Sequence, residues 1–385
     1  MGPMSSSWSA HHGERVTDLR RLLSLTQGEL SERSGIPQPN LSMIERGKRE
    51  LTVESAYRIA RATGTPLEFF GFKSATYSAE EINFRKSSKT SARGREYAVQ
   101  AFKEIERISI SLEKAPVRIK NTDIPVAEEA DIVSDNDIEA FALDARRCAG
   151  LADDEPVRNV IRTIERTGAA VAPLAVSVED PALLDGHSGL SRWDESAARA
   201  TVAFISGQPG DRQRFTLAHE FGHVVLHTRR NLPLELRETE ANLFAGAFLL
   251  PRTVAIENLS ETLTLHGYMR IKSRYGISVQ AAISRAKRLG IISAQRYKSL
   301  MIQISSRGWR KAEPVEVGIE KPARLWTELT ATYGPKPYFP ASPDLGVAPV
   351  FLEQWIPARE GRAAGRTTTP TDSNVVSFAA RGRQS

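Results

Sequence analysis

Apolar residues recur at helical spacing near the amino end of the chain, where one helix face comprises Val16, Leu19, Leu22 and Leu23. Thr26 is suited to cap a second helix, Gly35 to turn the chain, and residues 37–45 to form a third helix. Further helices are expected over 53–63 and 66–70. This order of short helices predicts a helix-turn-helix module.

The middle of the chain combines a β-prone run with strongly apolar helices. Residues 200–205 are suited to a strand and precede the turn-rich residues 207–211. A buried helix is predicted over 215–227, and a second helix over 235–251 follows a break at Pro233. Strand, loop and helices in this order predict an α+β domain.

Three other segments also have regular patterns. The apolar stripe of residues 93–113 predicts a long helix that links or dimerises. Residues 157–175 predict a helix followed by a strand. Residues 275–300 have a sequence pattern typical of helix-turn-helix segments. We interpret them as a helical subdomain that packs on the α+β domain and controls access to it.

The run His219-Glu220-Phe221-Gly222-His223 lies inside the predicted helix 215–227. At about 3.6 residues per turn, His219 and His223 lie one above the other on one face. H-E-x-x-H on a helix is the minimal ligand pair plus base of a zinc-dependent peptidase, and Glu220 is placed to reach a water at the ion. Gly222 costs roughly 1 kcal/mol against alanine, which indicates a close backbone approach near the metal.

A catalytic zinc site needs a third protein ligand and keeps its fourth position for water. On the helix 235–251, Glu238 shares the buried face with Asn242, and a buried carboxylate needs a cation or strong donors. Glu238 is therefore the predicted ligand, with Glu240 as the alternative, while Asn242 is expected to orient a ligand. His227 is interpreted as a helix C-terminal histidine or as a group supporting a ligand.

The strings F-T-L-A-H-E-F-G-H-V-V-L-H and E-T-E-A-N-L-F-A-G-A-F-L-L-P resemble the ImmA/IrrE family of metallopeptidases in order and spacing. The resemblance implies a gluzincin-like domain that binds zinc, or alternatively manganese, through His219, His223 and Glu238, with Glu220 activating water. Members of that family cut repressor proteins in stress, phage and mobile-element responses. The repressor-like module is here carried in the same chain, which leaves the substrate open.

The string T-Q-G-E-L-S-E-R-S-G-I-P-Q-P-N-L-S-M-I-E-R-G-K-R-E-L-T resembles the lambda-repressor-like (XRE) DNA-binding domains. In such a module the third helix enters the major groove of double-stranded DNA. The residues expected to meet base edges are Gln38, Pro39, Asn40 and Met43. Those expected to contact phosphates are Gln27, Arg46 and Lys48.

Composition and charge agree with a DNA-associated protein of the cytoplasm. The net charge of +6 and pI of about 9.4 favour an anionic partner. The single cysteine, Cys148, excludes a disulfide framework and fits a reducing compartment. No apolar run is long enough to span a bilayer, so no membrane partner is expected. A homodimer is the usual geometry of such a DNA-binding module.

The predicted fold class is multidomain: an all-α helix-turn-helix domain, then an α+β zincin-like (gluzincin) metallopeptidase domain and a helical C-terminal subdomain. The predicted boundaries are 1–12 (disordered lead), 13–71 (XRE-type domain), 72–125 (linker with basic cluster and helix), 126–255 (peptidase), 256–356 (helical subdomain and extension) and 357–385 (disordered tail).

These features predict a transcriptional regulator that carries a zinc-dependent endopeptidase and cleaves itself or a partner regulator. Zinc would polarise the scissile carbonyl, and Glu220 would take a proton from water and deliver it to the leaving amine. The alternative is a transcription factor, or antitoxin-like regulator, whose H-E-x-x-H domain senses a metal, ligand or partner without proteolysis.

Overall fold

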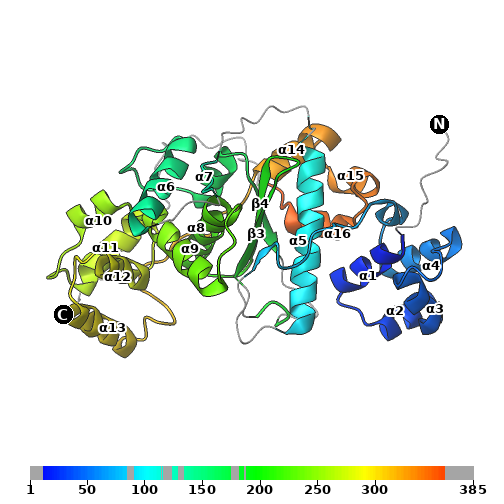
Figure 1. Cartoon of the computed structure of the whole chain (residues 1–385), viewed down its shortest axis with the longest axis horizontal. Coiled ribbons are helices and arrows are strands. Elements are labelled where there is room, and N and C mark those ends of the chain that lie inside the picture. The colour runs from blue at the N-terminus through cyan, green and yellow to red at the C-terminus, as the bar shows by residue number, and fades with distance from the viewer. Residues whose placement is uncertain are drawn as a thin grey trace, which may run out of the picture. The chain divides into compact units, whose positions relative to one another are not determined.

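The computed structural model describes residues 12–84, 91–113, 115, 124–128, 134–174, 182–185 and 188–359 (Figure 1). The predicted disordered lead and tail, and the basic cluster 85–90, lie almost entirely outside these residues. The chain divides into two compact units, each built from segments that are distant in the sequence. Of the described residues, unit 1 combines those within 12–119, 169–206 and 322–359, and unit 2 combines those within 120–168 and 207–321.

Unit 1 begins with the predicted helix-turn-helix bundle. Its elements are α1 (His12–Leu22), α2 (Gln27–Ser34), α3 (Gln38–Glu45), α4 (Val53–Thr63) and the 3₁₀ helix η1 (Leu67–Gly71). Thr26 caps α2 in a capping box with Glu29, as its position in the sequence predicts. Gly35 turns the chain between α2 and α3 with φ of 65°, a conformation that favours glycine. The buried Leu41 and Ile44 attach α3 to the bundle.

The remainder of unit 1 is a small mixed sheet with helices. Its strands are β1 (Asn83–Phe84), β2 (Ala170–Leu174), β3 (Gly189–Asp194) and β4 (Arg199–Ile205), and its helices are α5 (Ala92–Leu112), α14 (Arg324–Tyr333), α15 (Tyr338–Leu345) and α16 (Pro349–Trp355). The strand order is β1-β3-β4-β2. β3 pairs antiparallel with β1 and β4, whereas β2 runs parallel to β4 with Val171 opposite Val202.

The helix α5 corrects the predicted linker 72–125. One face of α5 contacts α1, and other positions contact β2 and β4, so that the apolar stripe is buried in a core shared by the helix-turn-helix bundle and the sheet (Figure 1). Phe102 and Ile105, for example, are 0% and 1% exposed. An apolar stripe of this length buries a large area when it packs against other elements. The helix is therefore part of the core of unit 1 and not a linker between domains.

The predicted subdomain 256–356 is also divided in the structure. Its first part belongs to unit 2, whereas α14, α15 and α16 belong to unit 1. α15 contacts η1, and the bend at Gly346 after α15 lies against the ring of Phe72. Apolar faces on these late helices complete the core of the first unit, although they are distant in sequence from it.

Unit 2 is helical in its described residues. Its helices are α6 (Asp135–Cys148), α7 (Val160–Arg166), α8 (Gly210–His227), α9 (Leu234–Leu249), α10 (Arg252–Asn258), α11 (Leu265–Tyr275), α12 (Val279–Arg288) and α13 (Ala294–Ser306). α8 packs on α9, and α6 contacts both helices. Within the described part of the chain, no helix combines the length and apolarity needed to cross a bilayer.

A buried ionic network holds α1, α5 and the residues around α15 together in unit 1. Arg15 on α1 and Arg107 on α5 donate to opposite oxygens of Glu104, at 2.6 Å and 2.8 Å. Arg15 also stacks over the ring of Phe69, and Arg107 donates to the carbonyl oxygen of Leu345 at 2.7 Å. Because an unpaired charge in this core would be costly, the network fixes these elements relative to one another.

We expect the stability of unit 1 to fall in acid because of Glu104. Burial alone would raise the pKa of its carboxyl, but Arg107 and Arg15 outweigh burial and lower it to about 2. The carboxylate therefore stabilises the fold fully above the unfolded pKa of about 4.3. That contribution is lost as pH falls from there towards 2. Urea unfolding followed by tryptophan fluorescence at a series of pH values measures this loss.

The Glu104→Gln variant should be less stable near neutral pH, by on the order of 3 kcal/mol, because it leaves the two guanidinium groups without their shared carboxylate. Its stability should also change less between about pH 4.3 and 2 than that of the unmodified protein. Glu139→Gln, which removes the partner of Arg285 in unit 2, is the matched control. An equal acid dependence in the unmodified protein and Glu104→Gln would contradict the assignment.

Candidate metal centre and DNA-contacting surface

The packing of α9 on α8 depends on the glycine inside the H-E-x-x-H run. A Cβ atom at Gly222 would lie 2.9 Å from Cδ1 and 3.1 Å from Cβ of Phe244 on α9. The close approach predicted at Gly222 is therefore present, and it is made by the side chain of Phe244 on α9. Phe244 stacks on Phe248 and meets Phe221 edge-on, so it has little freedom to move aside.

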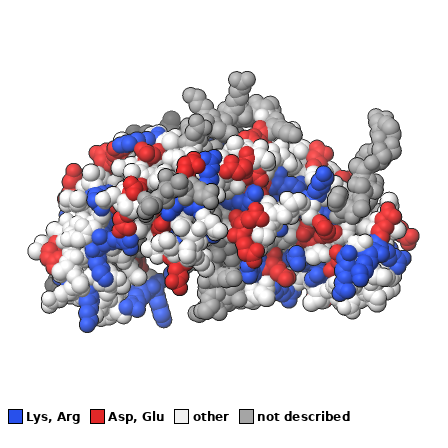
Figure 2. All heavy atoms as spheres, in the orientation of Figure 1, with Lys and Arg blue, Asp and Glu red and all other residues white. Residues whose placement is uncertain are grey.

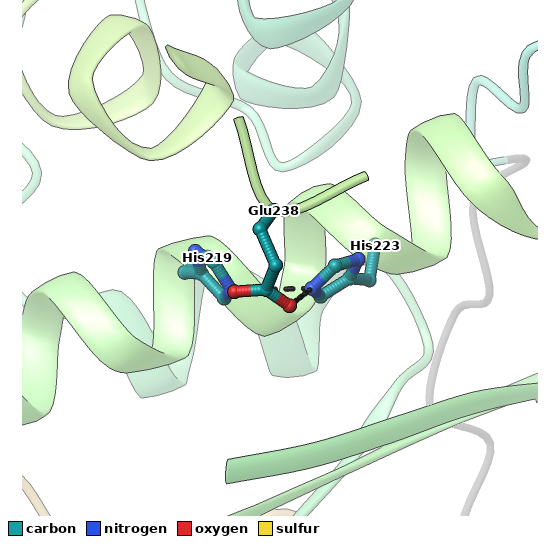
Figure 3. A group of neighbouring side chains, drawn as sticks. All are labelled: His219, His223 and Glu238. Atoms are coloured by element: carbon teal, nitrogen blue, oxygen red, sulfur yellow. Dashed lines mark hydrogen bonds and ion pairs between the residues drawn. The ribbon is translucent and has the colours of Figure 1, made fainter. Parts of the chain in front are cut away.

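This packing brings together the three residues predicted to hold a metal (Figure 3). His219 and His223 point from successive turns of α8 towards the carboxylate of Glu238 on α9. The two Nε2 atoms are 3.1 Å apart. Glu238 places Oε2 3.5 Å from Nε2 of His219 and Oε1 3.4 Å from Nε2 of His223. Both imidazoles are buried, and the Glu238 side chain is 19% exposed.

The spacing of these atoms fits a tetrahedral zinc ion. Ligand atoms at about 2.0–2.1 Å from zinc with tetrahedral angles lie roughly 3.3–3.4 Å from one another. The distances of 3.1, 3.4 and 3.5 Å among the three side chains are close to that requirement. Two imidazoles and one carboxylate are also the donor set of a zinc site that keeps a position for water. His219, His223 and Glu238 could therefore hold zinc.

Each histidine has a partner for the nitrogen that faces away from the other ligands. With Nε2 facing the metal position, the neutral ring carries its proton on Nδ1. Nδ1 of His219 then donates to Oδ1 of Asn242 at 3.1 Å, which is the orienting contact predicted for Asn242. Nδ1 of His223 donates in the same way to Nδ1 of His227 at 2.9 Å. Both rings are thus held with their Nε2 lone pairs directed inwards.

Glu240, the alternative ligand, has a different position and different partners. Its Oε2 accepts from Nε2 of His227 at 3.0 Å and from Arg230 at 2.8 Å. His223, His227, Glu240 and Arg230 therefore form a continuous hydrogen-bonded chain. Of the two readings of His227, the structure favours the group that supports a ligand, because its ring faces away from the helix terminus and towards His223.

Electrostatics keep the site in the protonation state that a metal requires. Burial, the largest cause, together with the neighbouring His219 and His227 lowers the pKa of His223 to about 3, although Glu238 acts in the opposite direction. Burial would raise the pKa of Glu238, but its close contacts with the two histidines outweigh burial and lower it. His223 is therefore neutral and Glu238 ionised near neutral pH, as metal ligands must be.

Glu220, the predicted base, follows His219 on α8 and is 1% exposed. The sequence did not indicate the nearby cation Arg237. Burial lowers the pKa of Arg237, whereas the charges of Glu238 and Glu220 raise it, which places the guanidinium in the field of both carboxylates. Arg230 was missed as well. Arg230 lies before the start of the predicted helix 235–251, and Arg237 lies just after it. Arginines at such positions are common on protein surfaces, so only the fold distinguishes these two from ordinary surface residues.

The predicted DNA-reading residues lie on the exposed side of the helix-turn-helix bundle. Gln38 and Pro39 are exposed at the start of α3, Asn40 is half-buried, and Met43 is 38% exposed. Arg46 and Lys48 are exposed just after α3. The base-reading candidates are therefore accessible from the start of α3 to Met43, and the phosphate-contacting candidates Arg46 and Lys48 are accessible just beyond its C-terminal end.

Gln27 differs from the other predicted contacts. It is half-buried at the start of α2, and its Nε2 donates to Oε2 of Glu45 on α3 at 2.8 Å. Glu45 also binds Arg20 of α1, at 3.0 Å. The amide of Gln27 thus braces α2 against α3 through Glu45.

Two segments of the chain are similar to known protein families. Residues 17–70 match the helix-turn-helix family, and residues 177–287 match the peptidase M78 family, described as the IrrE N-terminal-like domain. An uncharacterized HTH-type transcriptional regulator, y4dJ, of Sinorhizobium fredii is 46% identical over 52 residues, which are 14% of this chain and 68% of that protein. An uncharacterized transcriptional regulator in the ATPase CF(0) region of Rhodospirillum rubrum is 34% identical over 61 residues, 16% of this chain and 56% of that protein.

Replacing Gly222 with alanine should weaken metal binding. The added methyl group would displace Phe244 and with it the helix that carries Glu238, so we expect zinc affinity to fall by at least about tenfold. Gly246→Ala on α9 is the control, because its Cβ would meet only the Arg285 side chain at 3.4 Å. Competition with a chromogenic chelator measures both affinities; equal affinities in the two variants would show that this contact does not set the site.

Proposed function

The chain belongs to the helix-turn-helix family of transcriptional regulators and carries an IrrE N-terminal-like peptidase domain, and on that premise we propose that it is a DNA-binding regulator with a zinc-dependent endopeptidase. The observation that carries the proposal is the convergence of His219, His223 and Glu238 beside Glu220. Its substrate is a peptide bond in the chain itself or in a partner regulator.

The residues of the site have separable roles in this reaction. His219, His223 and Glu238 would hold zinc, or alternatively manganese, which when bound polarises the scissile carbonyl and acidifies water. Glu220 takes a proton from the attacking water and delivers it to the leaving amine. Asn242 and the chain from His227 to Arg230 orient the two imidazoles, while Arg237 supplies positive charge close to both carboxylates.

The donor set favours catalysis over a purely structural ion. A structural zinc site is closed by four protein ligands that are often cysteines, and the single cysteine, Cys148, is half-buried on α6 and is not part of the His219, His223 and Glu238 group. The described residues bring three ligands and a carboxylate base together instead. This arrangement supports hydrolysis more directly than metal sensing alone.

DNA binding would place the peptidase at an operator in the cytoplasm. Gln38 and Asn40 are suited to adenine, and Pro39 and Met43 to thymine methyl groups. Arg46 and Lys48 would contact phosphates without specifying sequence. Binding as a homodimer to paired half-sites would follow the usual geometry of this module, and cleavage would release the regulator in a stress, phage or mobile-element response.

Glu220→Gln should abolish cleavage without loss of metal. The amide cannot accept the proton from water, so we expect the rate to fall by about 10²- to 10⁴-fold while zinc content stays unchanged. Intact-mass detection of the zinc-loaded full chain measures cleavage in cis, and mapping of new amino termini in the host proteome measures cleavage in trans. His219→Ala is the comparison variant and should lose both metal and cleavage.

The same variant separates the proposal from a sensor or antitoxin-like regulator that does not cut. An operator-driven reporter should lose its response in Glu220→Gln if proteolysis is the signal. A full response in this variant, with metal bound and no cleavage product, would replace the peptidase with a metal-, ligand- or partner-sensing domain.

Substitutions on α3 should affect DNA binding in two distinguishable ways. With an operator obtained by in vitro selection, Gln38→Ala or Asn40→Ala should lower discrimination between bases by about 1–3 kcal/mol. Arg46→Ala together with Lys48→Ala should weaken binding to DNA of every sequence, and should reduce the slope of log affinity against log salt concentration by about 1.8. Fluorescence anisotropy at several salt concentrations measures both effects, and a loss of discrimination in the second variant alone would contradict the assignment of α3.

A further inference from the structure

Unit 2 contains a large groove that begins beside the candidate metal centre. Its volume is about 1310 Å³, which exceeds the roughly 300–1,000 Å³ of a typical small-molecule site. At one end it is lined by Phe215, one turn before His219, and by Thr239 and Asn242 on α9. Asn242 contacts His219 directly. The groove therefore reaches a residue that contacts one of the candidate metal ligands.

The opposite wall is a segment without regular structure, residues 309–319, which is anchored at both ends. Glu313 accepts from the backbone N–H of Val279 at 2.9 Å and from Nζ of Lys272 at 2.7 Å, so it caps the start of α12. Beyond the segment, the backbone N–H of Glu320 donates to Gln213 on α8 at 2.8 Å. These contacts hold the wall in place, and the groove is preformed.

The segment also passes very close to the start of α8. A Cβ atom at Gly210 would lie 2.1 Å from the carbonyl oxygen of Val317 and 2.6 Å from that of Gly318. Because the obstruction is backbone, a larger residue at 210 would push the wall outwards. Glycine at this position thus permits the closed geometry of the groove.

The charge of the lining is asymmetric. Lys272, Arg285 and Arg288 are neutralised by Asp211 with Glu313, by Glu139 and by Asp135, respectively. Four further cations line the groove and are exposed: Arg212, Lys287, Arg310 and Lys311. None of these four forms an ion pair with a carboxylate of the described residues. Among the described acidic residues that line the groove, only the exposed Glu316 likewise has no ion-pair partner. Figure 2 shows Lys and Arg side chains gathered over α12 and α13.

We propose that this groove binds an acidic, extended segment of the protein that the chain cleaves. The proposal rests on the proposed peptidase function and names its substrate class. Phe215 and Leu243 offer apolar contact near the metal centre, whereas the four exposed cations attract Asp and Glu side chains farther along. A DNA duplex is the other polyanion that exposed cations could attract, and it is an outcome of the test below.

The test measures binding in the absence of cleavage, with the zinc-loaded full-length Glu220→Gln protein. The probe is a fluorescein-labelled peptide of about 12 residues that alternates Glu and Ala and spans roughly 40 Å when extended. Peptides with Gln or Lys in place of Glu, and a random DNA duplex, are the comparison probes. We expect the Glu peptide to bind at least about tenfold more tightly than the Gln peptide in anisotropy titrations and to lose this preference at high salt.

Charge reversal locates the binding site. The substitutions Arg310→Glu and Lys311→Glu, added together to the test protein, should lower its affinity for the Glu peptide by at least about tenfold. Arg252→Glu with Arg270→Glu is the matched control, because both residues are exposed in unit 2 and lie outside the groove lining. Circular dichroism and zinc content verify that both double variants are folded. Equal weakening in the two double variants, or no preference for Glu over Gln, would overturn the proposal.

Cleavage data separate this inference from the peptidase assignment. Cleavage sites mapped with the unmodified protein should have Asp or Glu enriched on one side of the cut bond. Cleavage without such enrichment would overturn the acidic groove and leave the peptidase intact. Glu-specific binding without any cleavage would leave the groove intact and overturn the peptidase. If the protein shows no preference for the Glu peptide, and the Arg310→Glu, Lys311→Glu variant no longer binds the DNA duplex, the groove would be assigned to nucleic acid and the proposal overturned.

Discussion

The closeness with which α9 can approach α8 is the constraint on which the candidate metal centre depends. Glu238 is on a different helix from the two histidines, so its distance from them is set by packing and not by local helix geometry. Gly222 removes the one side chain that would keep Phe244 away, and the Phe221, Phe244 and Phe248 rings fill the interface without space to shift. Gly222 lowers the intrinsic stability of α8, and the packing of α9 against α8 offsets that cost.

A second layer of polar contacts converts this proximity into a defined ligand set. Buried histidines could otherwise adopt either tautomer, and the wrong one would direct a proton towards the ion. Asn242 and His227 remove that ambiguity, and Glu240 with Arg230 fixes His227 in turn. In unit 1 a comparable buried network around Glu104 joins the DNA-binding bundle to α5 and the residues after it. In both networks, each buried carboxylate is paired with a guanidinium group, which is a condition for tolerating its charge.

Much of this arrangement could be predicted from local sequence, because helix caps, turn glycines and helical spacing act over a few residues. The bounds of α4 and β4, the caps at Thr26 and Gly35, and the choice of Glu238 over Glu240 on its helix face follow from such short-range rules. The composition of the two compact units could not be predicted in this way, for the opposite reason. Unit 1 assembles α5, the sheet and the late helices α14 to α16 from three distant segments, and no local pattern states which apolar faces will meet. The roles of Arg230 and Arg237 were missed, and two readings of His227 stayed open, because each role depends on contacts that only the fold creates.

Metal content is the most direct test of the central claim, since every proposed role in unit 2 depends on an ion held by these three side chains. Elemental analysis of the purified full chain beside His219→Ala and Glu238→Ala provides it. We predict about one zinc ion per chain in the unmodified protein. We also predict its loss from both variants, with the helical fold retained. A chain that purifies without metal and cannot be loaded with zinc or manganese, or variants that keep the same metal content, would contradict the account.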